Sequence, residues 1–162
     1  MRFNIVDVMK KSFGTVFTSE KKVEDSVPKT DKLNVLADLS REILFEAKSV
    51  YPYELFPDKI TICLNRITIT YKKPFSLDER PIPVEYLNTA HVTRGLFFAS
   101  LSIETFGVER PNPIHHLKID DANTARRYIL GLIECKKNGV NYVEYDIEEI
   151  KEKLLEIGQI RE

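Results

Sequence analysis

The sequence predicts an α+β fold, a strongly bent antiparallel sheet or small barrel capped by a C-terminal helix, with extra helices at both ends. Residues 59–71 alternate apolar and polar side chains on both sides of Asn65 and Arg66, which is typical of a β-hairpin. Residues 120–133 instead carry apolar side chains at helical spacing. A series of short strands followed by one amphipathic helix indicates a sheet that uses the helix to bury its open side.

Composition indicates one domain with extensions. The chain has 162 residues, a formal net charge of −1 and 43% hydrophobic residues, so it can bury a sizeable core but has no overall positive charge to attract nucleic acid. Its cysteines, Cys63 and Cys135, have no metal-ligand spacing and do not predict a disulfide framework, which favours a reducing cytoplasm. No apolar run reaches the ~18 residues of a membrane span, and the N-terminus lacks the uninterrupted apolar region of a secretory signal.

Residues 1–17 carry apolar side chains that fit one face of a helix, with lysines close by. One interpretation is an interfacial helix on anionic lipid. The other, which we favour, is a helix docked on the domain or a loosely ordered arm, because Asp7, Glu20 and Glu24 dilute the positive charge. Residues 18–30 are polar and resemble a linker. The candidate membrane-contacting residues are Phe3, Lys10, Lys11, Phe13 and Phe17.

Residues 31–48 predict an amphipathic helix. Asp31 or Thr30 can cap its first turn, and the connector 51–57, with Pro52 and Pro57, ends it. The helix could pack on the sheet or on a second copy of the protein. Its apolar face would consist of Leu33, Leu36, Leu39, Ile43, Leu44 and Ala47.

Short strands are expected near residues 59–64, 66–73, 79–85, 89–94, 97–106 and 114–119. A tight turn at Asn65–Arg66 would join the first pair, with Asn65 tolerating a positive φ. Residues 74–78 would form the next loop. Pro81 and Pro83 lack an N–H donor, which places their strand at a sheet edge or a bend.

Helices are expected at 120–137 and about 147–157. Aspartates begin the first helix and lysines end it, as the helix dipole favours, and Asn138–Gly139 is a suitable stop. Asp146 and Glu149 could form a capping pair for the second helix, which Gly158 would end.

The chain resembles the bacterial PH-like domain family, whose fold is that of pleckstrin-homology domains, over about residues 54–137. The resemblance implies a non-enzymatic binding or assembly module, in a family whose role is often unassigned and whose members often carry transmembrane helices. Phosphoinositide-binding relatives use a long basic loop in the first hairpin, whereas this hairpin has only Asn65–Arg66. The resembling segments are 65–69, 79–84 (Glu-Arg-Pro-Ile-Pro-Val), 92–95, 101–107 and 120–125.

No catalytic, metal or cofactor site is predicted. Adjacent strand residues point to opposite faces, so His115 and His116 cannot easily share a metal, and His91 is distant in sequence. The acidic pairs at 78–79 and 120–121 each have a structural explanation at a strand start or a helix N-terminus. No glycine-rich phosphate loop is present.

The expected function is therefore a cytoplasmic, non-catalytic PH-like module that binds a protein partner or itself, with residues 1–53 as arm, linker and helix, 54–138 as the PH-like domain and 139–162 as a helical extension. A strand edge or an amphipathic helix would serve as the contact surface. The alternative is peripheral binding of anionic lipid at the inner membrane face through the N-terminal arm. A candidate basic rim for an anionic ligand or partner consists of Arg66, Lys72, Lys73, Arg80 and Arg94.

Overall fold

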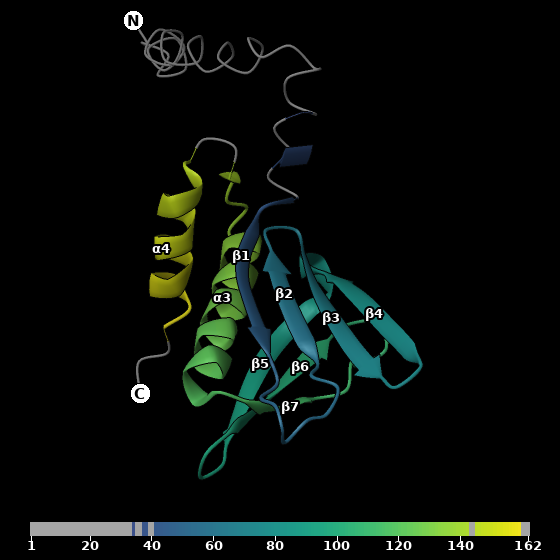
Figure 1. Cartoon of the computed structure of the whole chain (residues 1–162). Helices are drawn as coiled ribbons and strands as arrows, with labels where there is room; N and C mark the ends of the chain where they lie inside the picture. The colour runs from purple at the N-terminus through teal and green to yellow at the C-terminus, as the bar shows by residue number, and fades with distance from the viewer. Residues whose placement is uncertain (1–33, 35–36, 39–40, 143–144, 160–162) are drawn as a thin grey trace, which may run out of the picture. The chain divides into compact units, whose positions relative to one another are not determined.

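The structure, a computed structural model, describes residues 34, 37–38, 41–142 and 145–159. The chain divides into two compact units, residues 1–34 and 35–162. The fold described below is that of the second unit. It is α+β, with antiparallel sheets of four and three strands and the helices α3 and α4 (Figure 1).

The first sheet has the strand order β1–β2–β3–β4, formed by Ile43–Lys48, Lys59–Cys63, Arg66–Lys73 and Ser76–Pro83. Alternation in β2 and β3 turns Ile60, Ile62, Ile67 and Ile69 into the core, where none of them is more than 1% exposed. The predicted hairpin of 59–64 and 66–73 is therefore confirmed.

β1 corrects the helix predicted over residues 31–48. Within this range the helical residues that the structure describes lie at or before Arg41, whereas 43–48 pair with β2. The register shifts between Ile43 and Phe45, so a bulge turns both Leu44 and Ala47 inward. Buried residues three positions apart are also what one face of a helix shows, which is why this segment was predicted to be helical. The sheet therefore extends N-terminal to residue 54.

Two turns also differ from the predictions. Leu64 and Asn65 form the β2–β3 turn, and His116, not Asn65, is the non-glycine residue with positive φ among those described. The loop expected at 74–78 contracts to Pro74 and Phe75, because β4 begins at Ser76.

β4 forms an edge of the first sheet, as Pro81 and Pro83 predict. Its strand runs Ser76–Pro83 rather than 79–85, because Val84 begins the short 3₁₀ helix η1 (Val84–Tyr86). η1 leads into the second sheet, β5–β6–β7, formed by Leu87–Arg94, Ala99–Thr105 and Ile114–Leu117.

The two sheets do not close into a barrel, in contrast to the barrel alternative, but they are connected at one side. Ser49 Oγ donates a hydrogen bond to the carbonyl of His115 at 2.7 Å, and the Val50 amide donates to the carbonyl of His116 at 2.8 Å. The chain leaving β1 is thus fixed to β7. Elsewhere the Tyr71 hydroxyl of β3 donates to the Asn112 carbonyl before β7, at 2.7 Å.

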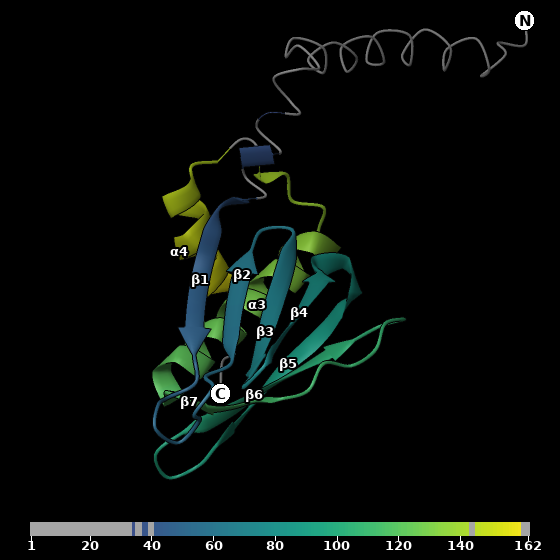
Figure 2. The ribbon, with the colours of Figure 1, turned by 45° about the vertical axis from the view of Figure 1, so that its right-hand side comes forward.

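α3 (Ile119–Lys137) and α4 (Ile147–Ile157) confirm the predicted C-terminal helices. α3 buries its apolar face in the core shared with both sheets, and α4 packs against α3 (Figure 2). Asp146 caps α4 by accepting a hydrogen bond from the Glu148 amide. Gly131 and Gly158 permit the close approach of the two helices, since a Cβ at Gly131 would clash with the Leu154 carbonyl oxygen.

Candidate functional site

A group of exposed apolar side chains gathers at the end of the sheets where β1 turns into β2 and β5 turns into β6 (lower end in Figure 1). Soluble proteins rarely expose such groups without a function. We refer to this group as the loop-end surface. It consists of Tyr51, Tyr53, Leu55 and Phe56 from the β1–β2 loop and Leu96 and Phe97 from the β5–β6 turn.

Aromatic contacts join the two loops. The rings of Tyr53 and Phe98 lie 4.6 Å apart, so the β1–β2 loop touches the β5–β6 turn directly. The His116 ring packs against both, at 6.4 Å from Tyr53 and 6.0 Å from Phe98. Its Nδ1 lies 3.0 Å from a carboxylate oxygen of Glu54. His116 of β7 therefore packs against both loops and adds to their direct contact.

The backbone of His116 has a positive φ at the point where β7 contacts both loops. Its φ is +55°, a left-handed conformation that is uncommon for residues other than glycine. The Val50 hydrogen bond to its carbonyl and the Glu54 contact with its ring lie on the same loop, residues 49–58. Strained residues persist only where the surrounding structure fixes them, and they are frequent at functional positions.

The five cations of the predicted basic rim are not brought together. Arg66 begins β3 and Lys73 ends it, so they lie at opposite ends of an eight-residue strand. Lys72 and Lys73 lie at the same end as the loop-end surface, since the Lys72 amide donates to Asp58 of the β1–β2 loop. Arg94 is also at this end, where it donates to Asn123 of α3.

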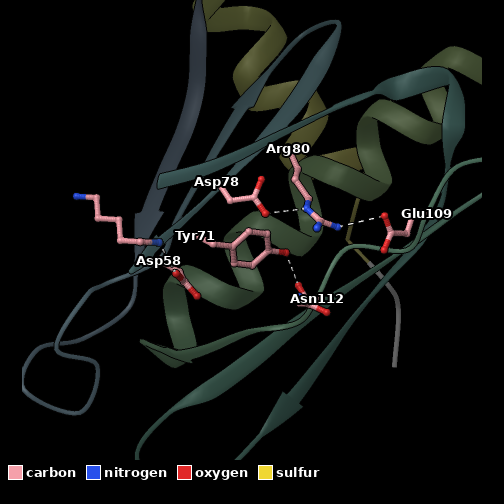
Figure 3. Close-up of polar contacts among 7 residues, drawn as sticks. Asp58, Tyr71, Asp78, Arg80, Glu109 and Asn112 are labelled. Atoms are coloured by element: carbon pink, nitrogen blue, oxygen red, sulfur yellow. Dashed lines mark hydrogen bonds and ion pairs between the residues drawn. The ribbon is translucent and has the colours of Figure 1, made fainter. Parts of the chain in front are cut away.

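Arg80 lies within the first sheet, where carboxylates neutralise it. It contacts Asp78 at 3.1 Å and Glu109 at 3.6 Å, and its guanidinium lies 6.0 Å from the centre of the Tyr71 ring (Figure 3). Asp78, one of the acidic pair at 78–79, thus has Arg80 as a structural partner. Arg80 is better described as part of a surface ion-pair network than as a free anion site.

Burial shifts two acids beside this network. It raises the pKa of Tyr71 to about 12 and raises that of Asp58, although the hydrogen bond from the Lys72 amide opposes the second shift. Both groups therefore favour their protonated forms more than they would in water. Their hydrogen bonds give each of them a structural role.

The rings of His115 and His116 lie 6.4 Å apart, whereas His91 and the helix-start carboxylates have contacts or positions of their own. His91 lies 3.8 Å from Glu104, and the ring of His115 contacts Ser100 at 2.9 Å. Asp120 and Asp121 are in the first turn of α3. In the described part of the chain, no group of three or more His, Cys, Asp or Glu residues could hold a metal ion.

A small apolar cavity of about 270 Å³ lies between the end of α3 and α4. It is lined in part by Cys135, Tyr142 and Leu154, and burial raises the pKa of both Cys135 and Tyr142. Both groups are therefore held in their neutral forms, which favours a packing role over a reactive one.

The candidate membrane residues of the arm, Phe3, Lys10, Lys11, Phe13 and Phe17, and the linker 18–30 lie outside the described residues. Among the described helices, none is both long and apolar enough to cross a membrane. No protein-family model matches the chain, and a search of curated proteins finds no matching relative.

Sequence reasoning missed the loop-end surface because it interpreted residues 51–57 only as the end of a helix. The available signal was the density of large apolar residues in the short segment 51–57, namely Tyr51, Tyr53, Leu55 and Phe56. Large apolar residues in an irregular segment either pack into the core or form an exposed apolar patch. In the structure these four residues are exposed.

Proposed function

We propose that this protein is a non-catalytic binding module of PH-like fold, and that it docks through the loop-end surface. The observation that carries the proposal is the exposure of large apolar side chains on two loops that are fixed to each other, with Leu96 at 86% and Tyr51 at 69%. Covering this exposed apolar surface with a partner removes it from water, which makes a favourable contribution to the binding free energy.

The order of elements supports the PH-like part of the proposal. A series of antiparallel strands followed by a helix that packs on both sheets is the order of elements that the resemblance implies. With β1 included, the first hairpin is β1–β2 and not β2–β3, so its loop is residues 49–58. That loop contains Glu54 and Asp58 but no lysine or arginine, which argues against a basic phosphoinositide pocket.

Preorganisation also supports a binding role. Tyr53 packs on Phe98 and His116, while Ser49 and Val50 hold the loop to β7. A loop fixed before binding loses less conformational entropy when a partner covers it. The partner classes that fit are a protein, a second copy of this chain or a lipid surface.

Site-specific photo-crosslinking tests this proposal for all three classes. A benzophenone side chain replaces Phe97 in the full chain, and the matched control replaces Phe106, an exposed aromatic at the other end of β6. We expect protein, self or lipid adducts in producing cells from position 97 and not from 106. Equal yields at the two positions, or no adduct at 97, would refute docking through the loop-end surface.

A further inference from the structure

The cavity of about 270 Å³ at the end of α3 follows one face of α4. Residues one, four, five and eight positions beyond the first share one face of a helix, and five residues of α4 that line the cavity have this spacing. The stripe extends over about two turns of the helix, or about 12 Å. It consists of Glu149, Ile150, Lys153, Leu154 and Ile157.

The chain that connects α3 to α4 forms the other wall (Figure 1). Gly139, just after α3, has a φ of +66°, and the Val140 amide donates to the Cys135 carbonyl at 3.0 Å, so the chain turns back over the helix end. The Tyr145 amide then donates to the Tyr142 carbonyl at 3.2 Å, shortly before α4 begins. These bonds place residues 135, 140, 142 and 145 around the cavity.

The two helices are already in backbone contact beside the cavity. A Cβ at Gly131 would clash with the Leu154 backbone, and a Cβ at Gly158 would clash with the Arg127 carbonyl. The Arg127 guanidinium also donates to the Leu155 carbonyl. Because nothing remains to compress at these contacts, α4 cannot move closer to α3 to fill the cavity. The hollow is therefore preformed, as ligand sites usually are.

The rim of the cavity is apolar and open to water. Val140, Tyr145 and Ile157 all line it and are 41%, 49% and 45% exposed. A molecule seated in the cavity would remove part of this surface from water in addition to the walls, which favours binding of an apolar compound.

A buried hydroxyl in the wall requires a hydrogen-bond partner. The Tyr142 hydroxyl is buried, and none of the residues that the structure describes pairs with it in good geometry. Beside it is the Cys135 thiol, which is only a weak acceptor. Burial raises the pKa of Tyr142, so the hydroxyl keeps its proton and stays a donor. Because buried donors without a partner are rare and costly, a ligand oxygen that accepts from Tyr142 would be favourable there.

Charge and size narrow the ligand further. Among the described residues, the charged ones that line the cavity are Glu149 and Lys153, one of each sign, and the Lys153 amine pairs with Glu156 at 2.8 Å. The cavity thus offers no net charge to an ion. An apolar cavity of about 150 Å³ holds a benzene molecule, so this one has room for about ten non-hydrogen atoms.

We propose that the cavity between α3 and α4 binds a small, neutral, mainly apolar molecule of one or two rings, whose oxygen accepts a hydrogen bond from the Tyr142 hydroxyl. The rings lie along the stripe of α4, and no covalent step is involved. This site is separate from the loop-end surface, which lies where β7 leads into α3, whereas the cavity is at the other end of this 19-residue helix. The inference therefore goes beyond the proposed function.

A pair of two-ring compounds tests the site on the full chain. 1-Indanone carries a carbonyl oxygen, and indane has the same ring skeleton without it. In a titration followed by amide chemical shifts, we expect both compounds to shift the amides of Cys135, Tyr142 and Leu154. 1-Indanone should bind about fivefold more tightly than indane, which is the factor that one neutral hydrogen bond contributes.

Tyr142→Phe should abolish this fivefold preference and leave the affinity for indane unchanged. Tyr145→Phe is the matched control, because it removes a hydroxyl from a half-exposed tyrosine of the same cavity and should retain the preference. The Tyr142 hydroxyl has no partner to lose, so the melting temperature of Tyr142→Phe should not fall below that of the wild type. A purely structural role for this hydroxyl would lower the melting temperature and leave the preference intact.

Val140→Trp adds bulk at the rim and should weaken binding of both compounds at least tenfold. The proposal would be overturned by the absence of shifts with either compound, by equal affinities in the wild type, or by a preference that survives in Tyr142→Phe. Binding that is unchanged in Val140→Trp would place the compounds elsewhere, and tighter binding of indane-1-carboxylate than of 1-indanone would refute the neutral ligand. The crosslinking result at position 97 bears on the loop-end surface alone, so the two proposals fail separately.

Discussion

Replacing Ser49 by alanine tests the connection between the two sheets. Ser49 is only 5% exposed, and its hydroxyl donates to the His115 carbonyl at 2.7 Å. The substitution removes one neutral hydrogen bond and leaves a partly buried carbonyl without this donor, while changing almost no volume. We expect the free energy of unfolding to fall by about 2 kcal/mol.

Ser100→Ala is the matched control, because Ser100 contacts the ring of the same histidine from an exposed position, at 2.9 Å. Its effect should stay within about 0.5 kcal/mol. Urea unfolding followed by far-UV circular dichroism measures both variants, and the Ser49 variant should also show a melting temperature lower by about 6 °C.

Hydrogen exchange supplies an independent readout. The amide of Val50, bonded to the His116 carbonyl, should exchange faster in Ser49→Ala than in the wild type, because the loop is then held by fewer bonds. Equal stabilities for the two serine variants, or an unchanged exchange rate at Val50, would refute the reasoning that this contact fixes the β1–β2 loop to β7.

Further predictions concern the sheets and the helix pair. The pKa of Tyr71 is raised to about 12 by folding, so its stabilising contribution is complete below pH 10 and is lost as pH rises from 10 to 12. Tyr71→Phe should therefore reduce the alkaline loss of stability by about 2 kcal/mol, measured by urea unfolding against an exposed control, Tyr51→Phe. Gly131→Ala should destabilise by roughly 1–2 kcal/mol despite alanine's better helix propensity, because its Cβ meets the Leu154 backbone; a melting temperature above that of the wild type would contradict this. Arg127→Ala removes the guanidinium that donates twice to the Leu155 carbonyl, at 3.0 and 2.6 Å; limited proteolysis should cut α4 faster, and an unchanged cleavage rate would argue against this clamp.

Most of the fold was predictable because its elements carry clean periodicity. The alternation in β2 and β3 and the helical spacing in α3 each bury one face, so local pattern and final structure agree. β1 was not predictable in the same way. Its bulge places the buried Leu44 and Ala47 three residues apart, and only pairing with β2 distinguishes this spacing from a helix.

The candidate site was less predictable than the fold. Lys72, Lys73 and Arg94 were identified from the sequence as cations near turns, and they do lie at the loop end of the sheets. Arg66 lies at the other end, because β3 runs from Arg66 to Lys73. The contact of Tyr53 with Phe98 joins residues 45 positions apart. A single sequence contains no periodic signal for such a pairing.

The prolines of β4 have a consequence for the behaviour of the protein in solution. Pro81 and Pro83 are two residues apart, so both of their nitrogens face the same side of the strand, and an edge strand keeps proline nitrogens on its unpaired side. A second chain that tried to add a strand there would find acceptors without matching donors. Growth of the sheet into fibrils is therefore disfavoured at the β4 edge.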